Sequence, residues 1–113
     1  MTRANILFVC SKNQWRSPTA EAVYRDDERV CVRSRGTARS AAQTIRSSDV
    51  AWADAILVMQ DKHRSRILAD FPGDCEFKSV HVLDIPDEYP LMDAELIKLI
   101  QSASEPIIDG LTQ

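Results

Sequence analysis

The feature that most constrains this chain is an apolar run, residues 6–9, followed at once by Cys10 and then by Arg16, Ser17 and Pro18. Such a run is typical of a buried parallel strand, and Ser17-Pro18 is typical of a helix N-cap with proline at the first helical position. The predicted strand, tight loop and helix aim backbone amides, a helix N-terminus and the Arg16 guanidinium at one hollow, which favours a tetrahedral oxyanion there. The residues predicted to bind phosphate are Ser11, Lys12, Asn13, Gln14, Trp15, Arg16 and Ser17.

Cys10 is predicted to lie at the floor of this pocket. The positive field of the helix N-terminus and Arg16 favours the thiolate, which is the nucleophilic form of cysteine. The planar fork of Arg16 suits two equatorial phosphoryl oxygens better than a lysine would. Asn13 tolerates the left-handed backbone that a tight loop demands, and the Ser17 hydroxyl is predicted both to donate to Cys10 and to cap the helix.

The segment 8–21, FVCSKNQWRSPTAE, resembles the N-terminal signature of the low-molecular-weight protein tyrosine phosphatases. The match extends beyond the Cys-x5-Arg-Ser core to Asn13, Pro18, Ala20 and Glu21. Segments 34–37 and 52–59 resemble that family's region after the second strand and its third strand. The resemblance implies a cysteine-dependent phosphomonoesterase, of the protein tyrosine phosphatase kind, that works through a phosphocysteine intermediate with Cys10 and Arg16 as catalytic residues and without a metal or cofactor.

Length and hydrophobic patterning agree with this. A chain of 113 residues that is 44% hydrophobic is expected to form one domain, residues 1–113, around a single core. Strands are predicted near 4–9, 30–34, 55–59 and 79–84, and helices near 18–26, 62–70 and 93–103, with helical turns near 48–53 and 105–110. We predict a break at residues 104–106, between the helix near 93–103 and the helical turn that follows it. The alternation predicts an α/β fold, a three-layer doubly wound, four-stranded parallel sheet with helices on both faces.

A phosphatase also needs an acid for the departing oxygen, and two aspartates are candidates. Asp84 and Asp87 follow the fourth predicted strand, at the sheet edge where Cys10 lies. The family carries its general acid there as an aspartate directly followed by proline. This chain departs from that pattern, because Ile85 separates Asp84 from Pro86 and Asp87 follows the proline. Counting back from the next helix, whose expected N-cap is Asp93, favours Asp84, whereas a slip of a few residues favours Asp87.

Three further departures from the family bear on the pocket. Lys12 stands where the family usually has glycine, so it either keeps ordinary dihedral angles or strains the loop. Trp15 replaces a neighbouring cysteine that relatives use as a disulfide partner. The connection between Thr37 and Trp52 is short, which predicts a lower pocket wall and leaves the substrate open between a phosphotyrosine protein and a small phosphomonoester.

Charge is unevenly distributed along the chain. Between residues 29 and 46 there are no acidic residues, and the basic residues are Arg29, Arg33, Arg35, Arg39 and Arg46. This stretch can line a groove for an anionic substrate, although a solvated face balanced by the acidic C-terminal portion is the interpretation we favour. His63 is predicted to be a surface helix residue. The formal net charge of −3 and the absence of a nucleic-acid-binding pattern argue against a nucleic-acid partner.

Cys10, Cys31 and Cys75 are too scattered for a disulfide framework or a zinc site. The sequence has no long apolar segment, so a cytoplasmic protein without membrane contact is expected. We also expect a monomer. Two alternatives remain open. An arsenate reductase of the same fold needs a relay of closely spaced cysteines, for which only Cys31 and Cys75 are available, and a weak phosphate-binding module is conceivable because the acid loop is altered.

Overall fold

The computed structural model describes residues 3–112 and contains one parallel sheet. Its strands are β1 (Ala4–Cys10), β2 (Val30–Gly36), β3 (Ala55–Val58) and β4 (Ser79–Val82), in the order β2-β1-β3-β4. Every neighbouring pair runs parallel. All four strands lie where the apolar and β-branched runs predicted them.

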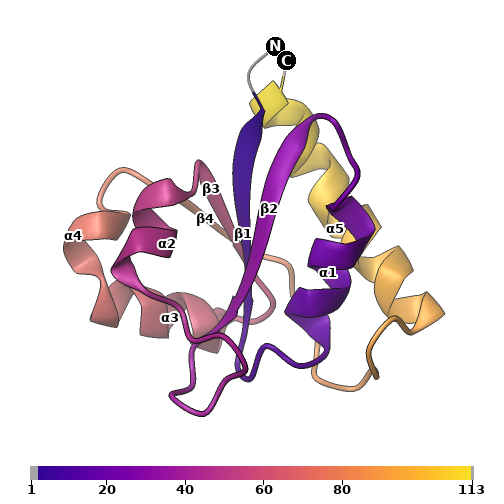
Figure 1. The fold of residues 1–113 in the computed structure, drawn as a ribbon, viewed down its shortest axis with the longest axis horizontal. Helices are drawn as coiled ribbons and strands as arrows, with labels where there is room; N and C mark the ends of the chain where they lie inside the picture. Colours follow the sequence, from indigo (N-terminus) through magenta and orange to yellow (C-terminus); the bar gives the residue numbers. More distant parts are fainter. Residues whose placement is uncertain (1–2, 113) are drawn as a thin grey trace.

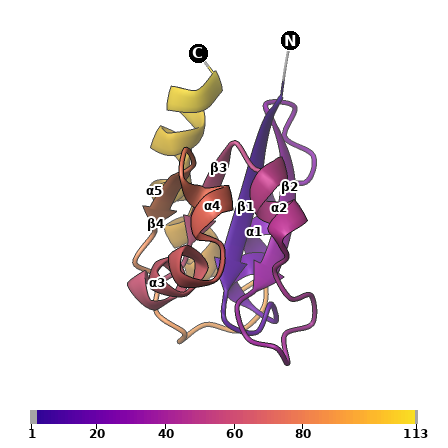
Figure 2. The same ribbon diagram turned by 90° about the vertical axis from the view of Figure 1, so that its left-hand side faces the viewer.

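Helices cover both faces of the sheet, as Figure 1 and the turned view in Figure 2 show. α1 (Arg16–Tyr24) and α5 (Ala94–Thr112) lie on one face. α2 (Ser47–Trp52), α3 (Asp61–Asp70) and α4 (Pro72–Cys75) lie on the other. The predicted three-layer α/β architecture is therefore confirmed.

The alternation of side chains along β1 divides the apolar interior into two layers. Ile6, Phe8 and Cys10 point into a cluster closed by α1 and α5. Leu7 and Val9 point into a second cluster, which is closed by α2 and α3. Because β1 is buried on both faces, its sequence is a continuous apolar run, as expected for the inner strand of a doubly covered parallel sheet.

The predicted break at residues 104–106 is wrong, because α5 continues through Pro106 to Thr112. A proline inside a helix costs about 3 kcal/mol. The buried residues Leu96, Ile100, Ser104 and Ile108 recur every four positions and form one stripe across Pro106. Burying Ile108 recovers about 1.5–3 kcal/mol, so packing offsets the local cost.

The carboxyl ends of β1 and β2 bring two loops together. One is the phosphate loop, residues 10–17, and the other is the segment 37–44, which follows β2. Thr37 N donates to Cys10 O at 2.9 Å and Ala38 N donates to Ser11 O at 2.9 Å. A Cβ added to Gly36 would lie 2.6 Å from Ser11 O, so the absence of a side chain at Gly36 permits this close approach.

Within residues 3–112, no helix is both long enough and apolar enough to span a bilayer.

Candidate active site

The phosphate loop joins the end of β1 to the start of α1 and buries several groups that can form hydrogen bonds. Cys10 is 3% exposed, Asn13 5% and Ser17 0%. Asn13 has a φ of 56°, the left-handed conformation that the sequence predicted for it. Its Nδ2 donates to Ser17 Oγ at 3.0 Å, and Ser17 Oγ lies 2.9 Å from Cys10 Sγ. Asn13 and Ser17 thus form a polar support under the sulfur atom.

Ser17 is not the N-cap of α1, which corrects the prediction. The helix begins at Arg16, its N-cap is Trp15, and that residue makes no side-chain capping bond. Ser17 instead turns its hydroxyl inward, where Cys10 Sγ at 2.9 Å and Arg35 O at 3.3 Å compete for its single proton. The short Cys10–Ser17 contact lets Ser17 donate to the sulfur whenever Cys10 is a thiolate, which can only accept.

Arg16 is 2% exposed, and two protein acceptors fix the plane of its guanidinium. Its Nη1 donates to Gln60 Oε1 at 2.6 Å and to Ile85 O at 2.8 Å. Because Nη1 is used in this way, Nε and Nη2 are the pair available for two phosphoryl oxygens. Sequence reasoning identified Arg16 but not Gln60, which had no motif to mark it.

A small pocket of about 40 Å³ opens above the loop, and its lining residues are Cys10, Ser11, Lys12, Gln14, Trp15, Arg16 and Asp87. Asn13 and Ser17, which were also predicted to bind phosphate, are buried and do not line it. Lys12 avoids the left-handed region, and its amine bonds to Ser40 Oγ in the segment 37–44. Trp15 is 46% exposed at the rim.

Asp87, rather than Asp84, is the aspartate at this pocket. Asp87 Oδ1 lies 3.7 Å from Arg16 Nε, and the Asp87 side chain is 53% exposed. Asp84 has a φ of 57° and is exposed outside the pocket. The cause lies in Ile85, which is 2% exposed and donates from its backbone N to Met59 O at 2.8 Å. Anchoring Ile85 in the core displaces Asp84 outward and carries Asp87 over the pocket, so the order of preference from sequence counting is reversed.

Solved structures have a similar fold, whereas no protein-family model and no curated protein sequence gives a significant match. The YwlE arginine phosphatase from Geobacillus stearothermophilus is 25% identical over 96% of this chain and 90% of its own, with a TM-score of 0.70. The tyrosine phosphatase Wzb from Escherichia coli K30, solved with phosphate, is 21% identical over 97% and 99%, with a TM-score of 0.75. A low-molecular-weight phosphotyrosine phosphatase from Vibrio cholerae O395, VcLMWPTP-2, is 22% identical over 97% of both chains, with a TM-score of 0.77. The chain has the low-molecular-weight protein tyrosine phosphatase fold. The resemblance first inferred from residues 8–21 is confirmed at this level.

One residue of this phosphatase fold was misjudged from the sequence. His63 is 1% exposed, not a surface residue. Its Nδ1 accepts a hydrogen bond from Gln60 N at 3.0 Å, so in the neutral ring Nε2 carries the proton and donates to Ser11 Oγ at 2.8 Å. Burial, and next the charges of Arg16 and Lys62, lower the pKa of His63 to about 4. The helical spacing of His63 and the buried Ile67, four residues apart, was the available signal for burial.

Within residues 3–112, no group of three or more histidine, cysteine or acidic side chains is arranged to hold a metal ion. Among the residues that line the pocket, the Cys10 sulfur, the Arg16 guanidinium and the Asp87 carboxylate can act on a ligand there.

Proposed function

We propose that the protein is a phosphoric monoester hydrolase of the protein tyrosine phosphatase kind, with Cys10 as nucleophile, Arg16 as phosphate ligand and Asp87 as general acid. The observation that carries this proposal is the shared lining of one pocket by all three side chains. The fold, shared with several phosphatases, supports it. The substrate is a phosphorylated protein side chain or a small phosphomonoester.

In the first step, Cys10 Sγ attacks the phosphorus in line with the ester oxygen. The S–P bond forms, the ester P–O bond breaks, and Asp87 gives its proton to the departing oxygen. Arg16 Nε and Nη2 and the loop amides stabilise the charge on the equatorial oxygens. Because Gln60 and Ile85 already fix the guanidinium, little reorganisation is needed during the reaction.

In the second step, the Asp87 carboxylate takes a proton from a water molecule, whose oxygen attacks the phosphocysteine. The S–P bond breaks, inorganic phosphate leaves, and Cys10 returns as a thiolate that the Ser17 hydroxyl can stabilise. The half-exposed position of Asp87 suits both steps, because the leaving group and the incoming water reach it from solvent.

The arsenate reductase alternative is not favoured. Cys31 pairs with Asn5 at the start of β1, whereas Cys10 pairs with Gly36 at its end, which separates the two cysteines by about 16 Å at about 3.3 Å per residue. Cys75 is buried in the cluster on the α2 and α3 face, where burial raises the pKa of its thiol. Neither cysteine lines the pocket.

The test is phosphate release from para-nitrophenyl phosphate across pH, with reductant present and no added metal. We expect activity in the wild type, none in Cys10→Ser, and a large loss with an altered basic limb in Asp87→Asn. Asp84→Asn is the matched control, since asparagine also tolerates the left-handed φ at that position. Phosphate binding without turnover by the wild type would leave an anion-binding module, and a loss confined to Asp84→Asn would overturn the assignment of the acid.

A further inference from the structure

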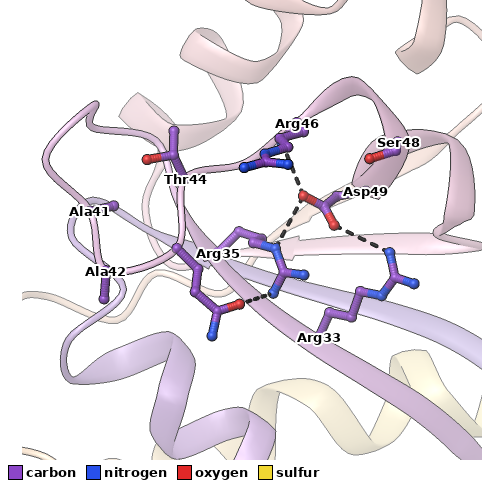
Figure 3. Close-up of a pocket in the computed structure, with 9 residues that line it drawn as sticks. Arg33, Arg35, Ala41, Ala42, Thr44, Arg46, Ser48 and Asp49 are labelled. Atoms are coloured by element: carbon purple, nitrogen blue, oxygen red, sulfur yellow. Dashed lines mark hydrogen bonds and ion pairs between the residues drawn. The ribbon is translucent and has the colours of Figure 1, made fainter.

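A second and wider groove, of about 630 Å³, lies between the edge strand β2, the segment 37–44 and α2. Figure 3 shows its side chains, and the three that are basic, Arg33, Arg35 and Arg46, surround Asp49. Arg33 and Arg35 are two residues apart on β2, so both project from the face that carries α2. Three of the five arginines in the basic stretch therefore line this hollow, whereas Arg29 pairs with Glu105 and Asp109 in the acidic C-terminal portion, as the sequence interpretation expected.

Asp49 organises the groove from beneath. It is 3% exposed and accepts from Arg33 Nη1 at 3.2 Å, from Arg35 Nε at 3.1 Å and from the backbone N of Arg46 at 3.0 Å. The Arg33 guanidinium also lies 4.2 Å from the centre of the Trp52 ring. These contacts hold two guanidinium groups in place before any ligand arrives, which lowers the ordering cost of binding.

The groove keeps a surplus of positive charge. One carboxylate faces three guanidinium groups, a formal balance of +2. Arg35 donates from Nε to Asp49 and from Nη1 to Ser34 O and Gln43 Oε1. Its Nη2 is therefore the nitrogen that can donate to a ligand. Guanidinium groups arranged in this way match carboxylate and phosphate oxygens.

The segment 37–44 connects this groove to the catalytic pocket. Ala42 lines the groove, and its backbone N donates to Lys12 O in the phosphate loop at 3.0 Å. A small phosphomonoester has no flanking groups to place outside the pocket, whereas an extended peptide advances about 3.3 Å per residue and carries side chains on either side of its phosphorylated residue.

We propose that this groove is a second anion site that binds acidic side chains of a protein substrate while its phosphorylated residue occupies the Cys10 pocket. The proposal rests on the proposed function, because it assigns the class of substrate to that same enzyme. The recognised chemistry is a carboxylate or a second phosphate group near the phosphorylated residue.

The test compares phosphotyrosine peptides of equal length with glutamate, phosphoserine or glutamine flanks. For each flank, kcat/KM is measured with the wild type, and Kd is measured with the Cys10→Ser protein, which does not turn over. Arg46→Gln and Arg33→Gln remove groove charge, and Arg25→Gln, an exposed arginine at the far end of α1, is the matched control. Removing one exposed charge contact corresponds to at most about fivefold in binding.

The proposal predicts that at least one of the two acidic peptides binds and reacts better than the glutamine peptide. It also predicts that high salt removes this preference, and that the two groove variants reduce it about two- to fivefold while Arg25→Gln does not. Preference for glutamate alone or phosphoserine alone identifies the source of the anion. Equal binding of all three peptides, or an equal effect of Arg25→Gln, overturns the proposal. Because the Kd values come from Cys10→Ser, they test the groove even if the wild type proves inactive, in which case the proposed function fails separately.

Discussion

Replacing His63 with glutamine should change how stability depends on pH. The wild-type imidazole is buried and neutral, held by Gln60 N on one side and by Ser11 Oγ on the other. Protonation would replace the Nδ1 acceptor with a second donor facing the Gln60 amide, next to the charges of Arg16 and Lys62. Glutamine fills a similar space and does not titrate.

The direction and size of this pH dependence follow from the pKa of His63, which is about 4 in the folded protein and about 6.5 in the unfolded chain. Between these two pH values the unfolded chain binds more protons, so the free energy of unfolding rises with pH. This contribution is complete above about pH 6.5 and is lost as the pH falls toward 4. It amounts to about 2 kcal/mol between pH 7.5 and 5, and to at most about 3–4 kcal/mol in all.

The assay is urea unfolding of wild type and His63→Gln at several pH values from 5 to 8. Asp27 and Glu105, whose pKa values hydrogen bonds from Arg29 lower, also weaken the fold in acid, but they do so in both proteins and cancel in the difference. The stability advantage of the wild type should shrink by about 2 kcal/mol toward pH 5. An advantage that stays constant over this range would refute the buried, neutral imidazole.

Three further changes test separate parts of the structure. Arg16→Lys should lower kcat on para-nitrophenyl phosphate by about 10²–10³, because a point charge replaces the fork, and a near wild-type kcat would contradict that role. Gly36→Ala should lower the free energy of unfolding by about 1–3 kcal/mol in urea titrations, since its Cβ meets Ser11 O, whereas Gly110→Ala, with open space around it in α5, should raise it by about 0.5–1 kcal/mol; equal effects would refute the close approach. Asp93→Ala should cost about 1 kcal/mol in thermal unfolding, because Asp93 Oδ2 caps the amides of Glu95 and Leu96, and an unchanged Tm would argue against the cap.

Local patterns were sufficient to predict the fold and the centre of the site. The apolar run before Cys10 predicted β1, and the residues after it predicted a loop with Asn13 in a left-handed conformation. Asp93 was predicted as an N-cap and is one. In each case the outcome depends on neighbours within a few positions, so the sequence carries enough information.

The positions of the remaining site residues depend on contacts between segments that are distant in the sequence. Ser17 does not cap α1, because its hydroxyl instead bonds the Cys10 sulfur and the Asn13 amide. His63 is buried and bonds Ser11, which is 52 residues away in the sequence. Asp87 displaced Asp84 as candidate acid because Ile85 is anchored in the core. None of these can be read from spacing alone, because tertiary packing decides them.

The central claim, that Cys10 carries the phosphoryl group, is tested most directly by trapping that intermediate. Asp87→Asn protein is mixed with para-nitrophenyl phosphate, whose nitrophenolate is a good enough leaving group for the slowed first step to proceed without the acid. The reaction is quenched within one turnover and analysed by peptide mass spectrometry. The account predicts a phosphoryl group on the peptide that contains Cys10, accumulating because the base for the second step is absent. Nitrophenol release with no phosphoryl group on Cys10 at any time point would contradict it.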